Sequence, residues 1–324
     1  MPQTYKLSPA RKAMRPARWR SQGLAAVLWL TGCGQQNGIV GREPAPDGGG
    51  PDAGRVPTYR TDFVDSGAWQ SQTRVPKAST AFGVPISGAG DANTAELRFP
   101  GHPEYPATSD IGATYRTELE SPQEFGFGSY RTRLSFGSCR PSEDTVNATL
   151  GYFSDGSDAN QNGLTDEEEI DFQLLCGTPN RLFLTVFTDY QADASSGAEQ
   201  FRKLSRAIDF STGEVFDTPA PDQEGFIKTD TRTAWVRPEL FAEGAFYTAG
   251  FEWHASSLRF FLELDGVEQT LWTLSDPARI PQHPVTFLYN LWHPDTHWYP
   301  ASGVAAFPAD DVVMHVDWFE YYAE

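Results

Sequence analysis

The feature that most constrains the fold is a period of two in the apolar residues, repeated in short runs along the chain. In Tyr130–Phe136, apolar residues and a Thr alternate with two Arg and a Ser. Leu258–Leu264 alternates in the same way and leads into Asp265-Gly266, a strong β-hairpin signal. Val312–Phe319 alternates with both faces largely apolar, as in a buried strand. Many short strands predict an antiparallel β-sandwich; only Ala198–Ile208 favours a short helix.

Charge and motif content narrow the functions that are possible. The chain carries 25 Lys and Arg against 43 Asp and Glu, a net charge of −18, which disfavours nucleic acid as a partner. Aromatic residues make up 13% of the sequence, more than disordered chains contain. No phosphate-binding loop, Gly-x-Ser-x-Gly elbow or His-Glu-x-x-His motif occurs, so we expect no organic cofactor.

The first residues have the composition of an export signal. Residues 1–32 contain six basic residues and no acid, followed by an apolar run over 23–30 that is too short to span a bilayer. The run ends in Leu30-Thr31-Gly32-Cys33, which resembles the lipobox of bacterial lipoproteins. The resemblance implies that Cys33 is lipidated and that the protein is exported and anchored to the outer membrane or cell surface. The alternative is a signal peptide that happens to end near a Cys.

The segment after Cys33 is typical of a flexible tether. Residues 34–57 contain seven Gly and four Pro with few apolar side chains. We therefore divide the chain into a lipoprotein signal peptide (1–32), a tether (33–57) and one folded domain (58–324). The membrane is then a partner only through the lipid anchor, and the protein is expected to be a monomer.

A row of polar side chains gives the strongest functional signal. On a strand over 165–175, Glu169, Asp171 and Gln173 point to one face, and the intervening Ile, Phe and Leu point into the core. Two acids and an amide on one face are costly unless that face meets solvent or a ligand. Retaining glycoside hydrolysis needs such a row, with a carboxylate nucleophile and a nearby carboxylic acid that protonates the leaving oxygen.

The chain here resembles glycoside hydrolase family 16, the laminarinase, lichenase and agarase group, whose signature is Glu-x-Asp-x-Glu on a strand. Further blocks that resemble the family in the right order are Tyr115–Leu119, Phe127–Arg133, Phe246–Trp253, Leu258–Val267, Ile280–Trp292 and Met314–Tyr322. The resemblance covers residues 60–323. It implies a concanavalin A-like jelly roll of two antiparallel sheets, a retaining endo-β-glycosidase site, and β-glucan or galactan as the polysaccharide partner.

By this resemblance Glu169 matches the nucleophile and Asp171 the middle acid, but the acid/base position is Gln173. An amide cannot donate a proton as a carboxylic acid does, and general acid/base help is worth ~10²–10⁴ in rate. Three possibilities are open. The site is a lectin-like cleft that no longer cuts, it uses an acid from elsewhere, with Glu118 or Glu252 as candidates, or it cleaves only substrates whose leaving group needs no proton.

Three residues are predicted to contact sugar. Trp253 and Trp292 offer indole faces for stacking, and the resemblance places Trp292 in the cleft and Asn290 on the same strand. Trp298 is a weaker candidate. The alternative for any single Trp is packing in the core.

A candidate calcium-binding loop precedes the acidic strand. Asp158, Asn160, Asn162, Leu164 through its carbonyl, and Asp166 follow the spacing of an EF-hand loop, with Gly163 at the sixth position. An oxygen-only set favours Ca²⁺ over Zn²⁺. The alternative is a turn rich in Asp, Asn and Gly. The twelfth position is Glu169, and one carboxylate cannot serve both as a calcium clamp and as a free nucleophile.

The three cysteines predict one disulfide. With Cys33 lipidated, Cys139 and Cys176 are the two that are left in an exported protein, and each follows a predicted strand. A bridge requires their Cα atoms to lie within about 7 Å.

Overall fold

A computed structural model places the alternating runs in β-strands. It describes residues 54–73, 75, 77–90, 93–101, 116–140, 143–158, 166–176, 181–188, 203–218, 225–233, 236–237, 240–294 and 306–324. The chain divides into two units, residues 1–44 and 45–324, and all described residues belong to the second. Among them no helix is long and apolar enough to cross a membrane. The signal peptide and Cys33 lie outside the described residues.

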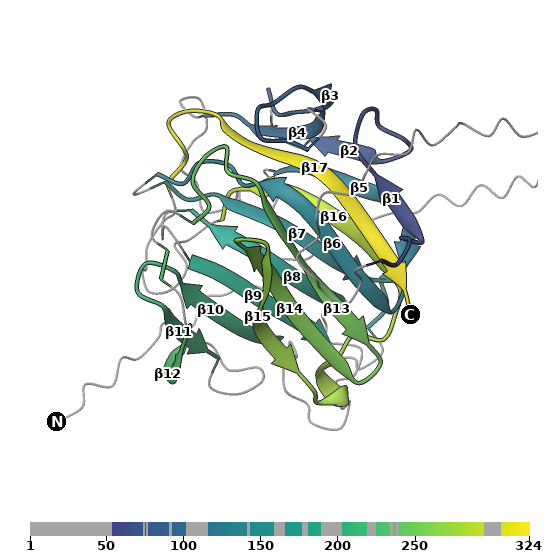
Figure 1. The fold of residues 1–324 in the computed structure, drawn as a ribbon, viewed down its shortest axis with the longest axis vertical. Helices are drawn as coiled ribbons and strands as arrows, with labels where there is room; N and C mark the ends of the chain where they lie inside the picture. The colour runs from purple at the N-terminus through teal and green to yellow at the C-terminus, as the bar shows by residue number, and fades with distance from the viewer. Residues whose placement is uncertain are drawn as a thin grey trace, which may run out of the picture. The chain divides into compact units, whose positions relative to one another are not determined.

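Two antiparallel sheets make up the domain (Figure 1). Across the eight-stranded sheet the described strands are β15 (Val267–Leu274), β14 (Ser257–Leu264), β13 (Tyr247–His254), β6 (Gly128–Ser135), β17 (Val312–Ala323), β4 (Thr94–Phe99) and β3 (Ser79–Val84), with β1 (Tyr59–Thr61) paired to β17. The nine-stranded sheet contains β12 (Ile227–Arg232), β11 (Glu214–Asp217), β10 (Lys203–Asp209), β9 (Arg181–Thr188), β8 (Glu168–Leu175), β7 (Val146–Phe153), β16 (Val285–Trp292), β5 (Arg116–Phe125) and β2 (Gln70–Thr73). A short 3₁₀ helix, η4, covers Pro277–Arg279. The fold is the expected all-β jelly-roll sandwich.

The period-two pattern works because alternate side chains fill the space between the sheets. Tyr130 from the eight-stranded sheet stacks on Phe287 from the nine-stranded sheet with ring centroids 5.8 Å apart. Phe287 in turn stacks on Phe319 at 4.3 Å. Burying such rings removes large apolar areas from water, which is the main favourable term in folding. One face of each sheet is thereby fixed as core and the other as an outer face.

The predicted hairpin is present, but the predicted helix is wrong. Asp265 and Gly266 both have positive φ, 55° and 73°, as a tight two-residue turn between β14 and β15 requires. Within Ala198–Ile208, residues 203–208 belong to strand β10, which pairs with β9 on one side and β11 on the other. Pairing along both edges outweighs the weak helical preference of this segment.

Candidate functional site

Strand β8 carries the predicted row of polar side chains. Ile170, Phe172 and Leu174 are fully buried in the core between the sheets. Glu169, Asp171 and Gln173 therefore occupy the outer face of the nine-stranded sheet. Asp171 is buried, while Glu169 and Gln173 keep part of their surface exposed.

Neighbouring strands surround this row mainly with apolar and uncharged side chains. Asp171 is registered with Leu150 on β7 and Thr185 on β9. Gln173 is registered with Ala148 on β7 and Phe183 on β9. A second apolar cluster covers this part of the outer face and is made of Val146, Ala148, Leu150, Leu175, Phe183, Ala207, Phe216 and Leu288. The carboxyl groups thus sit in surroundings that disfavour charge.

The two acids of β8 titrate as a pair. Burial raises the pKa of Glu169 well above its usual range, and the neighbouring Asp171 and Glu167 carboxylates raise it further. Burial also raises the pKa of Asp171 to about 7, while Lys203 and a hydrogen bond with Glu169 oppose that shift. Two hydrogen-bonded carboxyls that cannot both ionise share one proton. Both pKa values are raised, so the pair gives up its protons less readily than two separate carboxyls would.

This protonation state limits the chemistry of the row. A glycosidase nucleophile must be an ionised carboxylate, and its partner must be a carboxylic acid about 5–5.5 Å away. Here the predicted nucleophile Glu169 shares a proton with Asp171, and the predicted acid position holds the amide Gln173. The row can donate and accept hydrogen bonds to hydroxyl groups, but it is poorly set up for double displacement.

A second pair of acids lies on the same sheet, on β5. Glu118 is registered with Asn290 on β16, and Asn290 with Ala148 on β7, so Glu118 and Gln173 lie on one row across the sheet. Burial raises the pKa of Glu118 to about 7, against the opposing effect of Arg116, which lies 3.0 Å away. Glu118 also shares hydrogen bonds with Asn290 and Glu120.

The position of Glu118 rules it out as a substitute acid beside Glu169. Three strand spacings separate β5 from β8, about 14 Å. Glu252, the other candidate, is on β13 of the opposite sheet, where its carboxylate accepts hydrogen bonds from Arg259 at 2.6 and 2.8 Å. Neither carboxyl replaces the acid that Gln173 lacks.

The predicted sugar-binding residues fall into two groups. Asn290 and Trp292 both lie on β16 and occupy the same outer face as Gln173, and Trp292 is partly exposed and packs against the second apolar cluster. Trp253 is fully buried between the sheets, and its indole N–H donates to the Pro281 carbonyl at 2.9 Å. The expectation that Trp253 stacks on sugar is therefore wrong. Trp298 lies outside the described residues.

Only the two ends of the predicted calcium loop are described. Asp158 is exposed, and Asp166 is buried, with its backbone N–H donating to the Ser157 carbonyl at 2.9 Å. Asn160, Asn162 and Leu164 lie outside the described residues. Within the described part of the chain no three His, Cys, Asp or Glu side chains gather as a metal centre. Glu169, the twelfth position of the predicted loop, shares a hydrogen bond with Asp171.

Cys139 and Cys176 form a disulfide with an S–S distance of 2.12 Å and Cα atoms 4.6 Å apart. Cys176 directly follows β8 and Cys139 lies shortly after β6, so the bridge joins segments that follow strands of opposite sheets. It anchors the end of the acidic strand.

The sequence reasoning missed Glu120, Gln72 and Lys203. Gln72 donates to the Glu120 carboxylate at 2.5 Å, and Lys203 lowers the pKa of Asp171. The alternation Glu118-Leu119-Glu120 is a second acid-x-acid pattern on a strand and would have located the β5 pair. Lys203 carries no such signal, because its proximity to β8 depends on the pairing of β8, β9 and β10.

Comparison with solved structures agrees with this architecture. The chain matches a GlcNAcα1-4Gal-releasing endo-β-galactosidase from Clostridium perfringens with a TM-score of 0.50 and 11% identity, over 86% of this chain and 64% of that one. It also matches the Bacillus licheniformis β-glucanase (TM-score 0.45, 16% identity, 82% and 98% coverage) and LamAcat from Zobellia galactanivorans (TM-score 0.46, 15% identity, 84% and 99% coverage). At these identities the likeness concerns the fold. No protein-family model matches the chain, and no curated protein matches it.

Proposed function

We propose that this domain recognises a β-linked polysaccharide, a β-glucan or a galactan, on the outer face of the nine-stranded sheet, and that its hydrolysis is impaired or altered. The observation that carries the proposal is the row on β8. Glu169 and Asp171 occupy the nucleophile and middle positions of a glycosidase signature, and Gln173 occupies the acid position. Trp292 and Asn290 on β16 share that face and provide a stacking surface and an amide for sugar hydroxyls.

Binding without efficient turnover follows from the protonation of the site. Burial and the neighbouring Asp171 raise the pKa of Glu169, which weakens it as a nucleophile. Gln173 cannot protonate a leaving sugar. Both catalytic functions are therefore weakened while the hydrogen-bonding capacity toward hydroxyls is kept.

The second candidate function is a retaining endo-glycosidase of altered specificity. It is favoured by the retention of Glu169 beside Asp171. Such an enzyme would act on substrates whose leaving group departs without a proton. Both candidates predict affinity for β-glycan, and only the second predicts new reducing ends.

A polysaccharide panel scored for binding and for reducing-end release separates them. We expect the wild-type protein to bind at least one β-glucan or galactan and to release reducing ends no faster than a Glu169→Gln variant. Release that is rapid in wild type and lost in Glu169→Gln would favour the enzyme. Absence of binding to every β-glycan would contradict the proposal.

We further propose that the domain is exported and held at the outer membrane or cell surface through lipid on Cys33. The support is the basic and apolar leader, the lipobox-like end and the Gly- and Pro-rich tether. Metabolic labelling with a radioactive fatty acid tests it. Wild type is expected to incorporate label and Cys33→Ala to incorporate none, and equal labelling of the two would refute the assignment.

A further inference from the structure

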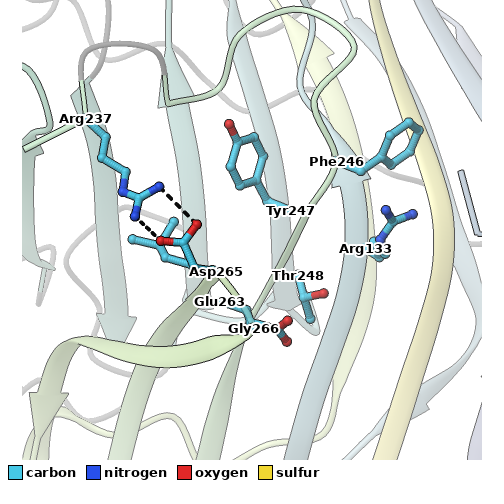
Figure 2. A pocket seen from close by; sticks show the side chains of 9 residues that line it. Arg133, Arg237, Phe246, Tyr247, Thr248, Glu263, Asp265 and Gly266 are labelled. Atoms are coloured by element: carbon cyan, nitrogen blue, oxygen red, sulfur yellow. Dashed lines mark hydrogen bonds and ion pairs between the residues drawn. The ribbon is translucent and has the colours of Figure 1, made fainter. Parts of the chain in front are cut away.

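A cavity of about 390 Å³ lies at the β14–β15 turn of the eight-stranded sheet (Figure 2). Side chains from both faces of the strands line it. Arg133 on β6, Thr248 on β13 and Glu263 on β14 line it, while their chain neighbours Leu134, Ala249 and Leu262 are buried between the sheets. Tyr247 and Leu264 also line the cavity and pack against the core, so the cavity lies at the strand ends, and it shares no residue with the site on β8.

The β14–β15 turn supplies one wall of the cavity. Its residue Asp265 faces Arg237, whose guanidinium donates two hydrogen bonds to the Asp265 carboxylate (Figure 2). Arg237 is itself held by its backbone N–H, which donates to the Phe210 carbonyl at 2.8 Å. This wall is the ion pair of Arg237 and Asp265, and both residues line the cavity.

Charges of both signs line the cavity and exclude several ligand classes. Arg133 is neutralised by the buried Asp317, which also accepts a hydrogen bond from the Gly90 N–H at 2.7 Å. Arg237 is likewise paired with Asp265, so the lining offers neither an anion nor a cation a strong net attraction. The polar lining also disfavours an apolar ligand. A neutral ligand with many hydroxyl groups is compatible with both the donors and the acceptors.

Aromatic side chains complete the site. Phe246 and Tyr247 line the cavity and are partly exposed. Arg133 stacks over the Phe246 ring at 4.9 Å from its centroid, and the Tyr247 hydroxyl accepts a hydrogen bond from the Phe241 N–H at 3.2 Å. These contacts hold the two rings in place. A sugar ring presents an apolar C–H face to such rings and hydroxyls to charged neighbours.

We propose that this cavity is a second carbohydrate site that binds one or two residues of a neutral glycan. It rests on the proposed function in one respect, the expectation that the domain meets polysaccharide. Two separate sites would allow the domain to hold two chains of an insoluble polysaccharide, which raises avidity without new contacts in either site.

Hydrogen–deuterium exchange of the full chain locates binding at each site separately. Laminaripentaose, cellopentaose and the anionic control trigalacturonate are each added at about 10 mM, since a contact with one or two rings is expected to give a Kd of about 1 mM. With the wild-type protein, we expect a neutral pentaose to slow exchange in the 242–246 loop and at the Asp265-Gly266 turn. Trigalacturonate should not slow exchange there.

A filled cavity gives the matched test. Thr248→Tyr places a ring inside it, and Thr273→Tyr adds the same ring to an exposed position of the same sheet face on β15. We expect pocket protection to disappear in Thr248→Tyr and to persist in Thr273→Tyr. Affinity for an insoluble β-glycan should fall about tenfold or more in Thr248→Tyr alone.

The outcomes distinguish this site from the one on β8. Protection of residues 169–173 without protection of the cavity in wild type would overturn the second site and leave the proposed function intact. Protection of the cavity alone would support the second site and contradict the proposed cleft. Equal cavity protection in Thr248→Tyr and wild type, or none with either pentaose, would overturn the inference.

Discussion

The two outer faces of the sandwich carry acidic side chains in opposite ways. On the eight-stranded sheet the acids are matched with Arg. Arg259 pairs with its cross-strand partner Glu252 and with Glu268, and Arg131 also pairs with Glu268 at 2.8 Å. On the nine-stranded sheet Glu169 and Asp171 lie beside each other, although other acids of that sheet, such as Asp209 beside Arg181, are paired with a base.

The difference separates structural charge from functional charge. Opposite charges across strands stabilise a sheet modestly and shield it from wrong contacts. Like charges that are buried together cost stability, and they persist where a ligand or a reaction uses them. The nine-stranded face is therefore where we place glycan recognition, and the predictions below test whether the two faces respond oppositely to the loss of one charge.

The largest expected effect is on the paired face. Glu268 is almost buried and accepts from two guanidinium groups, so Glu268→Gln removes the close carboxylate partner of Arg131 and leaves Arg259 with Glu252. We expect the free energy of unfolding to fall by about 2–4 kcal/mol, measured by urea denaturation at neutral pH. Glu263→Gln is the control, because Glu263 approaches Arg131 only at 3.9 Å. Equal losses in the two variants would contradict the ion-pair account.

At the Glu169–Asp171 pair on β8, removing one acid should instead raise the free energy of unfolding. The pKa of Asp171 rises from 3.8 to about 7 in the folded protein, so wild-type stability is full below pH 3.8 and is lost as pH rises through 7. Asp171→Asn removes that loss, and we expect a gain of about 1–3 kcal/mol above pH 7. Asp317→Asn, on a buried acid that pairs with Arg133, should instead be destabilising. A loss of stability in Asp171→Asn at high pH would refute the shared-proton interpretation.

Replacing Glu118 on β5 should also raise the free energy of unfolding, by a smaller amount. The pKa of Glu118 rises from 4.5 to about 7, so its contribution to stability is lost as pH rises through that window. Glu118→Gln should flatten the dependence of Tm on pH between 4.5 and 7. We expect the free energy of unfolding to rise by only about 1 kcal/mol above pH 7, because Glu118→Gln also removes the carboxylate that pairs with Arg116. A slope identical to wild type would show that Glu118 does not titrate there.

The smallest expected effect is that of calcium. We propose that the loop from Asp158 to Asp166 binds Ca²⁺, which would sit next to the like-charged end of β8. Binding to the folded state should raise stability by about 1 kcal/mol at a few times the Kd. Melting curves in EDTA and in excess Ca²⁺ measure it, and identical curves would exclude the site.

Local periodicity predicted the strands, and non-local pairing decided the rest. The alternation around Glu169 correctly separates core side chains from outer ones, because the period of two depends only on the backbone. Trp253 lies on a strand that alternates just as regularly, but the sequence of that strand does not show which of its two faces packs in the core. The segment 203–208 has helical spacing, but its pairing with β9 and β11 exists only in the folded sheet. The burial of Glu169 and the distance of Glu118 from β8 likewise depend on strand order.

The central claim is that β8 is a glycosidase row disabled at Gln173, and one gain-of-function measurement tests it directly. Reducing-end release from a β-glycan that wild type binds is compared in wild type, Gln173→Glu, and Gln173→Glu with Glu169→Gln. Glu has nearly the shape of Gln and supplies the missing proton, so Gln173→Glu should raise release by about 10²-fold or more, and the double variant should lose it. Brisk release by wild type that Glu169→Gln abolishes and Gln173→Glu leaves unchanged would contradict the account, because another residue would then donate the proton.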